Sequence, residues 1–188
     1  MTQLEYARRG LTTEKMKLAA AAEGVCPEFV REGIAAGTIV ICHNIKHANG
    51  TPLAVGAGLR TKVNANIGSS SDDTNILKEL EKARAAVKYG ADAIMDLSTG
   101  GPVDEIRRAI IAETNACIGS VPLYQAALDA VRVKKKAIVD MTVDDIFAGI
   151  VKHAEDGVDF ITVHCGVTLG TVERMKNCLL YTSPSPRD

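Results

Sequence analysis

Two stretches of the chain, YGADAIMDLS (residues 89–98) and DGVDFITVHC (residues 156–165), follow one pattern. In each, a glycine ends a helical segment, and a small apolar residue, an aspartate and a strand-forming run follow. This pattern is typical of the short helix-to-strand turn in a repeated strand–helix unit. Because strands that alternate with helices form parallel sheets, the two stretches predict an α/β fold.

Further units of the same kind lie around these two stretches. Strands are predicted over residues 62–68, 91–101, 118–125 and 158–166, and helices over residues 73–90, 102–116 and 142–157, with another helix starting at residue 168. Four units without a change of pattern suit the first half of a (β/α)8 barrel of the TIM type better than a complete domain. A Rossmann sheet is the alternative, but no GxGxxG follows a strand.

The chain is expected to have three parts. Residues 1–58 are predicted to be a small, mostly helical N-terminal region, with helices over residues 12–24 and 27–37 and a strand that leads into a turn at Asn49-Gly50. Residues 59–177 are predicted to form the partial barrel with strands one to four. Residues 178–188 contain an alternation of Ser and Pro at residues 183–186 and are interpreted as a non-native tail, the parent protein continuing beyond this point.

The polar residues of the predicted strands gather on one face. Asn64 and Asn66 share a face of the first strand, and a buried amide without partners costs about 1–3 kcal/mol. The amide face must therefore meet water, other polar groups or a ligand. Ser120, Pro122 and Tyr124 are assigned to the matching face of the third strand, and Thr162 and His164 to that of the fourth. In the second strand the alternation leaves Met95 and Asp96 as alternatives.

Barrel enzymes keep their active sites at the carboxyl ends of the strands. The predicted site lining is therefore Asn66, Met95 (or Asp96), Tyr124 and His164. The Ser-rich GSSSDD and the STGG segment lead into predicted helix N-termini, where free N–H groups attract phosphate.

Composition excludes several function classes. The net charge of −1 and the absence of tryptophan argue against nucleic acid, and no apolar run is long enough to span a membrane. The five cysteines stand singly, and no charged-then-apolar leader precedes the chain, so reduced thiols and a cytoplasmic location are expected. Each cysteine is interpreted as a small core residue or a bystander.

The motifs KVNANIGSS, GADAIMDLSTG, GSVPLYQA and DFITVHCGVT, with VCPEFVREGIAAGTIVI and NIKH upstream, resemble the phosphomethylpyrimidine synthase family. The resemblance covers residues 1 to about 177. It implies a (β/α)8 barrel enzyme of thiamine biosynthesis that uses radical S-adenosylmethionine chemistry to convert 5-aminoimidazole ribotide into 4-amino-5-hydroxymethyl-2-methylpyrimidine phosphate. Formate and carbon monoxide are the implied by-products.

The same resemblance implies site residues and cofactors. The substrate contacts of the family fall on Asn66, Met95, Tyr124 and His164. A [4Fe-4S] cluster, S-adenosylmethionine and zinc are implied for the full-length protein, which is expected to be a homodimer. The family's later substrate segments, its two zinc-ligand histidines and its cluster cysteines have no counterpart here, so this chain alone is expected to be inactive.

Each predicted site residue also has a structural interpretation. Asn64 and Asn66 could pin a layer of the barrel, Met95 could fill a gap in the core, and Tyr124 could begin a helix. A lone histidine such as His164 is more often a satisfied structural residue than a functional one. Two rival functions remain open, a non-catalytic half-barrel binding module and another barrel enzyme acting on a phosphorylated small molecule. No lysine stands at a strand tip to serve an aldolase.

Neither a metal site nor a nucleic-acid site is expected in this chain. His43 and His47 have the i, i+4 spacing of metal ligands, but they follow a β-branched run, and the helix that this spacing requires is not expected. The basic run of residues 132–136 is interpreted as a solvated face. No metal ligand is assigned in this chain.

Overall fold

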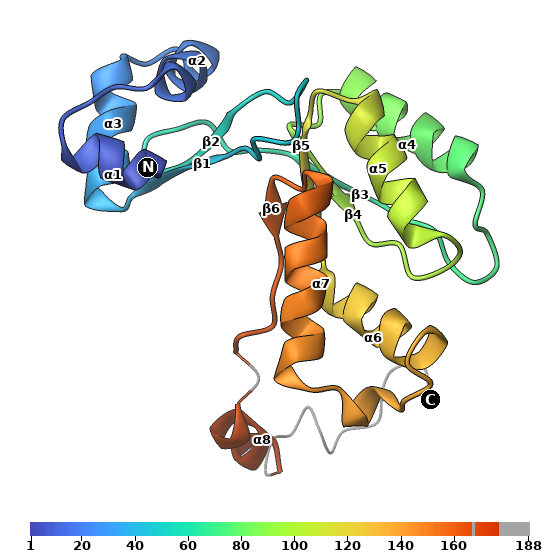
Figure 1. Cartoon of the computed structure of the whole chain (residues 1–188). Helices are drawn as coiled ribbons and strands as arrows, with labels where there is room; N and C mark the ends of the chain where they lie inside the picture. Colours follow the sequence, from blue (N-terminus) through green and yellow to red (C-terminus); the bar gives the residue numbers. More distant parts are fainter. Residues whose placement is uncertain (167, 177–188) are drawn as a thin grey trace.

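The computed structural model describes residues 1–166 and 168–176, in which an N-terminal region precedes a four-stranded parallel sheet covered by helices (Figure 1). The N-terminal region contains three helices and an antiparallel hairpin: α1 (Gln3–Arg8), α2 (Glu14–Glu23), α3 (Pro27–Ala36), β1 (Ile39–Cys42) and β2 (Leu53–Gly56). Residues 178–188, interpreted from the sequence as a tail, lie outside the described residues.

The predicted helix signals of this region are confirmed. The Thr13 hydroxyl accepts the Met16 N–H (3.2 Å) at the start of α2, and Gly24 ends the helix in the left-handed conformation (φ +69°). Pro27 opens α3, and Gly37 ends it. The three helices and the hairpin share a core that is separate from the core under the parallel sheet.

The parallel sheet has the strand order β3-β4-β5-β6, which is also the order along the chain. Its strands are β3 (Asn64–Ile67), β4 (Ala93–Asp96), β5 (Cys117–Ser120) and β6 (Phe160–Ile161), and all neighbours are parallel. The helices between and after them are α4 (Ile76–Lys88), α5 (Val103–Glu113), α6 (Pro122–Arg132), a 3-10 turn at Ile138–Asp140, α7 (Val143–Asp156) and α8 (Leu169–Met175). The predicted α/β class with a parallel sheet is therefore confirmed.

In the part of the chain that the structure describes, helices cover one face of this sheet with apolar side chains. Ile67, Ile94 and Ile118, one from each of three successive strands, are buried in one cluster with Ile106 and Ile110 of α5. The opposite face carries Asn64 and Asn66 on β3, and both are exposed. The alternation expected for β3 is thus present, with its apolar side under α4 and α5 and its amide side open.

The third and fourth predicted strands are too long. β5 ends at Ser120, because Pro122 lacks an N–H and starts α6, so Tyr124 lies in a helix and not in a strand. β6 contains only Phe160 and Ile161, and residues 162–164 continue without strand pairing. Ser120 also faces the helix-covered side of the sheet, where His153 of α7 binds it, and not the open side assigned from the sequence.

The sequence repeat that predicted the fold has a physical counterpart. Asp92 donates its N–H to the Val63 carbonyl (2.8 Å) and accepts the Val63 N–H on its carboxylate (2.7 Å). Asp159 makes the same pair of bonds to Ile118, each 2.8 Å long. In both units the aspartate before a strand therefore holds the start of the neighbouring strand.

The loop of residues 43–51 joins the N-terminal region to the sheet. The Asn44 N–H donates to the Asp159 carboxylate (2.7 Å), and the Thr51 N–H donates to the Asn115 carbonyl (3.0 Å). His47 is fully buried between Asp159 and the Thr114 carbonyl. These bonds fix the hairpin at the amino end of β5 and β6, so the open face meets solvent at its carboxyl end.

Candidate functional site

Asn66 lies on the open face of β3, one residue before the strand ends. The Asn64 amide donates to the Asn66 side-chain oxygen (2.9 Å), and both residues are exposed. The amides thus satisfy part of each other's hydrogen-bonding capacity and leave the rest to water. Among residues 1–166 and 168–176 the Asn66 NH₂ group has no protein acceptor, so it can meet a ligand.

Met95 is the neighbour of Asn66 on the same face. In the parallel register, Asn66 pairs with Met95, and Met95 pairs with Gly119 of β5. Asp96 points to the opposite face, where it is buried and accepts the hydroxyl (2.5 Å) and the N–H (3.0 Å) of Ser98. The structure therefore separates the two alternatives: Met95 belongs to the open face, while burial raises the pKa of Asp96 on the covered face.

Tyr124 lies in the first turn of α6, at the carboxyl side of β5. Its half-buried ring lines a depression of about 260 Å³ together with Thr99, which follows β4, and Leu128 and Ile138. Helical placement does not remove Tyr124 from this edge of the sheet, since α6 begins two residues after β5 ends. The side chain thus stands close to the loop that follows β4.

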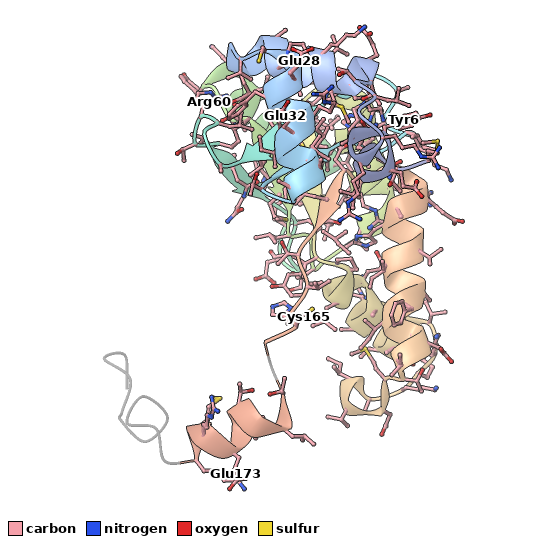
Figure 2. All side chains as sticks on the ribbon, turned by 90° about the vertical axis from the view of Figure 1, so that its left-hand side faces the viewer. Tyr6, Glu28, Glu32, Arg60, Cys165 and Glu173 are labelled. Atoms are coloured by element: carbon pink, nitrogen blue, oxygen red, sulfur yellow. The ribbon has the colours of Figure 1, made fainter. Side chains whose placement is uncertain are left out.

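His164 lies three residues beyond β6 and is exposed. With Ile161, Val163 and two apolar residues of α7, Phe147 and Ile150, it borders an apolar groove of about 440 Å³. Tyr124 and His164 therefore line separate depressions, while Asn66 and Met95 are direct neighbours. Figure 2 shows Cys165, the next residue, on the segment that leads from the sheet towards α8.

The loops after β3 and β4 bind each other tightly. The Ser69 N–H donates to the Ser98 hydroxyl (3.1 Å), the Ser69 hydroxyl donates to the Gly100 carbonyl (2.7 Å), and the Thr99 N–H donates to the Ser69 carbonyl (2.9 Å). A Cβ at Gly100 would lie 2.1 Å from the Ser70 carbonyl oxygen, so glycine is required for this approach. The Ser69 and Ser98 hydroxyls thus hold the two loops together beside Asn66 and Met95, and phosphate binding by the N–H groups of the helices that follow stays a prediction.

A buried arginine that sequence reasoning missed organises the covered side of this edge. Arg107 of α5 is only 2% exposed and donates two bonds to Asp156 (2.6 and 3.0 Å), one to Asp104 (2.7 Å), one to Gln125 (3.1 Å) and one to His153 (3.1 Å). These five bonds use all five donors of the guanidinium. Because the partners come from α5, α6 and α7, the arginine fixes the three helices relative to one another directly behind Tyr124.

The two buried histidines differ in charge: His153 is neutral, and His47 is protonated. Arg107 donates to Nε2 of His153, so that nitrogen carries no proton, and Nδ1 donates to the Ser120 hydroxyl (2.7 Å). Burial and the neighbouring guanidinium lower the pKa of His153 to about 4. Both nitrogens of His47 instead face acceptors, the Asp159 carboxylate (2.7 Å) and the Thr114 carbonyl (3.0 Å), which raise the pKa of that ring. His47 is therefore a cation in a buried ion pair.

No metal site forms among residues 1–166 and 168–176. His43, the i−4 neighbour of His47, accepts from Lys15 (3.0 Å) and donates to the Gly50 carbonyl (3.1 Å), so the two histidines do not face a common point. Within this part of the chain no group of three His, Cys, Asp or Glu side chains could hold a metal ion. The same residues contain no helix that is apolar and long enough to cross a membrane.

Comparison with known proteins gives a single family. Residues 2–182 match the family model described as Radical SAM ThiC family. The chain is 86% identical over 176 residues to the phosphomethylpyrimidine synthase of Geobacter metallireducens, a match that covers 94% of this chain and 40% of the relative.

More distant relatives align over the same region. Phosphomethylpyrimidine synthase 2 of Syntrophotalea carbinolica is 72% identical over 177 residues, and the phosphomethylpyrimidine synthase of Pyrococcus furiosus is 52% identical over 176 residues. Each match covers 94% of this chain and 41% of the relative. The chain thus spans about two fifths of the length of the relatives it matches.

Proposed function

Because the chain belongs to the radical SAM ThiC family, we propose that it forms the first part of the substrate site of a phosphomethylpyrimidine synthase. The parent enzyme converts 5-aminoimidazole ribotide into 4-amino-5-hydroxymethyl-2-methylpyrimidine phosphate in thiamine biosynthesis, as a carbon–carbon lyase. The observation that carries this proposal is the family match over residues 2–182. The open polar face beside Asn66 and Met95 supplies a surface on which such a substrate could bind.

The fold proposed for the parent is a (β/α)8 barrel, of which this chain contributes strands one to four. Three features support it: the strands are parallel and in chain order, helices cover one face, and the other face is open and partly polar. The exposed apolar side chains bordering the groove beside α7, such as Phe147 and Val163, are also what further units of a barrel would cover. Four further strands would close the sheet and turn the amide face inward.

Closure of the sheet would bring His164 level with Asn66. In an eight-stranded barrel with a shear number of eight, positions at one height advance by about one residue per strand. Register places Phe160 of β6 in the row of Asn66, so three strands later the equivalent height lies about three residues past Phe160. Thr162 and His164, which share the inward alternation of Phe160, lie one residue to either side of this height, and this supports a place for His164 at the same mouth.

The four proposed contacts suit a ribotide. The Asn66 amide and the Tyr124 hydroxyl can hydrogen-bond ribose hydroxyls or ring nitrogens without titrating near neutral pH. Met95 offers adaptable apolar packing against the heterocycle, and His164 can donate, accept or transfer a proton. Asn66 and Met95 lie one residue before the carboxyl ends of β3 and β4, Tyr124 lies in the first turn of α6, and His164 lies three residues beyond β6.

We propose that the metal cofactors of the parent bind outside the described residues. S-adenosylmethionine with a [4Fe-4S] cluster would supply the radical chemistry, but no three metal-ligating side chains converge in the described residues, so these residues do not fit a cluster or zinc and no step is assigned through them. We therefore expect the 188-residue chain alone to make no pyrimidine phosphate. The parent is proposed to be a cytoplasmic homodimer.

A chimera tests the proposal. Residues 1–176 of this chain would be joined to the C-terminal remainder of the Geobacter metallireducens relative and assayed anaerobically with reconstituted cluster, S-adenosylmethionine and the ribotide. The chimera should form the pyrimidine phosphate, whereas the 188-residue chain should not. An inactive but folded chimera, beside an active native relative, would refute the proposal.

Two asparagine variants test the site within the chimera. Asn66→Ala should lower kcat/KM by at least about tenfold, since one lost hydrogen bond to substrate is worth about 1.4 kcal/mol or more. Asn64→Ala is the matched control, because it removes an amide from the same face two residues further from the strand end, and it should change kcat/KM by less than about threefold. Equal effects of the two variants would remove Asn66 from the site.

A further inference from the structure

Two cysteines from distant parts of the chain meet where the N-terminal hairpin joins the sheet. Cys42 ends β1, and Cys117 begins β5. The Cys117 sulfur lies 3.9 Å from the Cys42 carbonyl oxygen, so the two cysteines are direct neighbours. Both thiols are free in this structure. Neither residue belongs to the proposed substrate site at the carboxyl end of the strands.

The surrounding hydrogen bonds hold these thiols together. Cys42 is paired with Leu53 in the hairpin, and two residues later the Asn44 N–H binds the buried carboxylate of Asp159. On the other side, Asn115 accepts the Thr51 N–H two residues before Cys117. The backbone on both sides of the pair is therefore fixed, which keeps the two cysteines beside each other.

The two thiols differ in access and in acidity. Cys42 is half-exposed, and the neighbouring Cys117 thiol lowers the pKa of its thiol. Cys117 is only 1% exposed, and the neighbouring Cys42 thiol together with burial raises the pKa of its thiol. Thiolates are the reactive form of cysteine, so Cys42 is the thiol that an outside reagent would meet first.

We propose that Cys42 and Cys117 form a reversible intramolecular disulfide when the protein meets a low-molecular-weight disulfide such as oxidised glutathione. The Cys42 thiolate attacks one sulfur of the reagent, a mixed disulfide forms, and one thiolate leaves and takes up the proton that Cys42 lost. Cys117 then loses its proton and attacks the Cys42 sulfur, which releases the second reagent thiol. The protein is oxidised by two electrons, and the reagent disulfide is reduced to two thiols.

This disulfide would covalently join the hairpin to the sheet. The bond closes a loop between residues 42 and 117, and closing a loop of this length removes much of the chain entropy of the unfolded state. The oxidised protein is expected to have a Tm roughly 5–10 °C above that of the reduced protein. Oxidation would therefore stabilise the folded chain rather than unfold it.

The test is oxidation of the 188-residue chain with oxidised glutathione, followed by blocking of free thiols with N-ethylmaleimide, proteolysis and mass spectrometry. We expect a cross-linked peptide containing Cys42 and Cys117 with the loss of two hydrogen atoms, reversed by dithiothreitol. Cys42→Ser should abolish the cross-link, and Cys117→Ser should stop the reaction at a glutathione adduct on Cys42. Cys26→Ser, which removes an exposed thiol, is the matched control and should leave the cross-link intact.

Separate labelling of Cys42 and Cys117 by N-ethylmaleimide after oxidation of the wild-type chain would overturn the proposal. Glutathione adducts confined to the exposed Cys26 and Cys165 would do the same. Since the mapping is made on wild-type protein, it does not depend on whether a serine variant folds. The outcome is also independent of the substrate proposal, because no turnover is measured.

Discussion

Replacement of Asp159 by asparagine should destabilise the chain far more than the same replacement of Asp92. The two aspartates occupy equivalent places in the repeated unit, and each binds the backbone of its neighbouring strand through the same pair of atoms. Their cationic partners differ. His47, bound to Asp159, is fully buried, whereas Arg60, bound to Asp92, has a side chain that is 57% exposed.

The magnitude follows from the partners left behind. Asp159 accepts hydrogen bonds from His47 (2.7 Å), Ile118 (2.8 Å) and Asn44 (2.7 Å), and asparagine offers one oxygen and places an NH₂ against a donor. Removing one partner of a buried ion pair costs about 3–5 kcal/mol, so Asp159→Asn should lower the free energy of unfolding by about 4 kcal/mol. Asp92→Asn should cost about 1–2 kcal/mol, since an exposed pair contributes up to about 1 kcal/mol and the strand amide about 1 kcal/mol more.

Urea unfolding at pH 7, followed by circular dichroism, measures both free energies in the 188-residue chain. A difference of about 2–3 kcal/mol between the variants is expected, with unchanged m values. Equal losses of unfolding free energy in the two variants would refute the prediction, because they would mean that the buried His47–Asp159 pair contributes no more to stability than the Arg60–Asp92 pair. A cost near zero for both variants would also refute the role of the repeated aspartate.

Two further predictions concern the buried histidines and the open face. In an NMR titration of the ring Cε1–H signals, His47 should remain protonated as the pH rises past 6.5, and His153 should remain neutral until about pH 4. The contribution of His47 to stability is full below pH 6.5 and is lost as the pH rises through the raised pKa of its ring. The contribution of His153 is full above pH 6.5 and is lost as the pH falls towards 4. Titration of either ring near pH 6.5 would contradict the assigned hydrogen bonds. Gly119→Ala should lower the free energy of unfolding by about 1–3 kcal/mol in urea, because the new Cβ would lie 2.3 Å from the Phe160 ring, and Phe160→Leu should restore part of it. Gly166→Ala, with nothing within 4 Å, is the control and should change stability by less than about 0.5 kcal/mol.

Local signals predicted most of the fold. Helix ends depend on interactions between residues close in sequence. The structure begins α2 and α7 after the predicted caps Thr13 and Thr142 and ends them at the left-handed glycines Gly24 and Gly157. The end of the third strand was predicted wrongly although its signal, Pro122, was in view, because the alternation of Ser120 with Pro122 was interpreted as a strand face. A proline that can open a helix is a stronger signal than alternation across two residues.

The polar interactions behind the site could not be predicted in the same way. Arg107 reaches Asp156 across 49 residues, and His47 reaches Asp159 across 112, so neither pair has a local spacing that marks it. A basic residue on a helix is normally solvated, and only the packing of three helices against one another buries Arg107. Long-range partners of this kind become visible only once the fold itself is known.

The repeated aspartate explains how a sheet with one open face remains ordered. A short parallel strand of four residues has few backbone bonds, and the start of each strand would fray without a partner. Asp92 and Asp159 add a side-chain acceptor for an N–H near the start of the neighbouring strand, and each carboxylate is held by a cation from the region that precedes the sheet, Arg60 or His47. Ion pairs and hydrogen bonds therefore order the amino ends of the strands, and the residues at the carboxyl ends are not needed for this. Asn66 and Met95 can accordingly expose polar and adaptable side chains there without loss of the sheet that carries them.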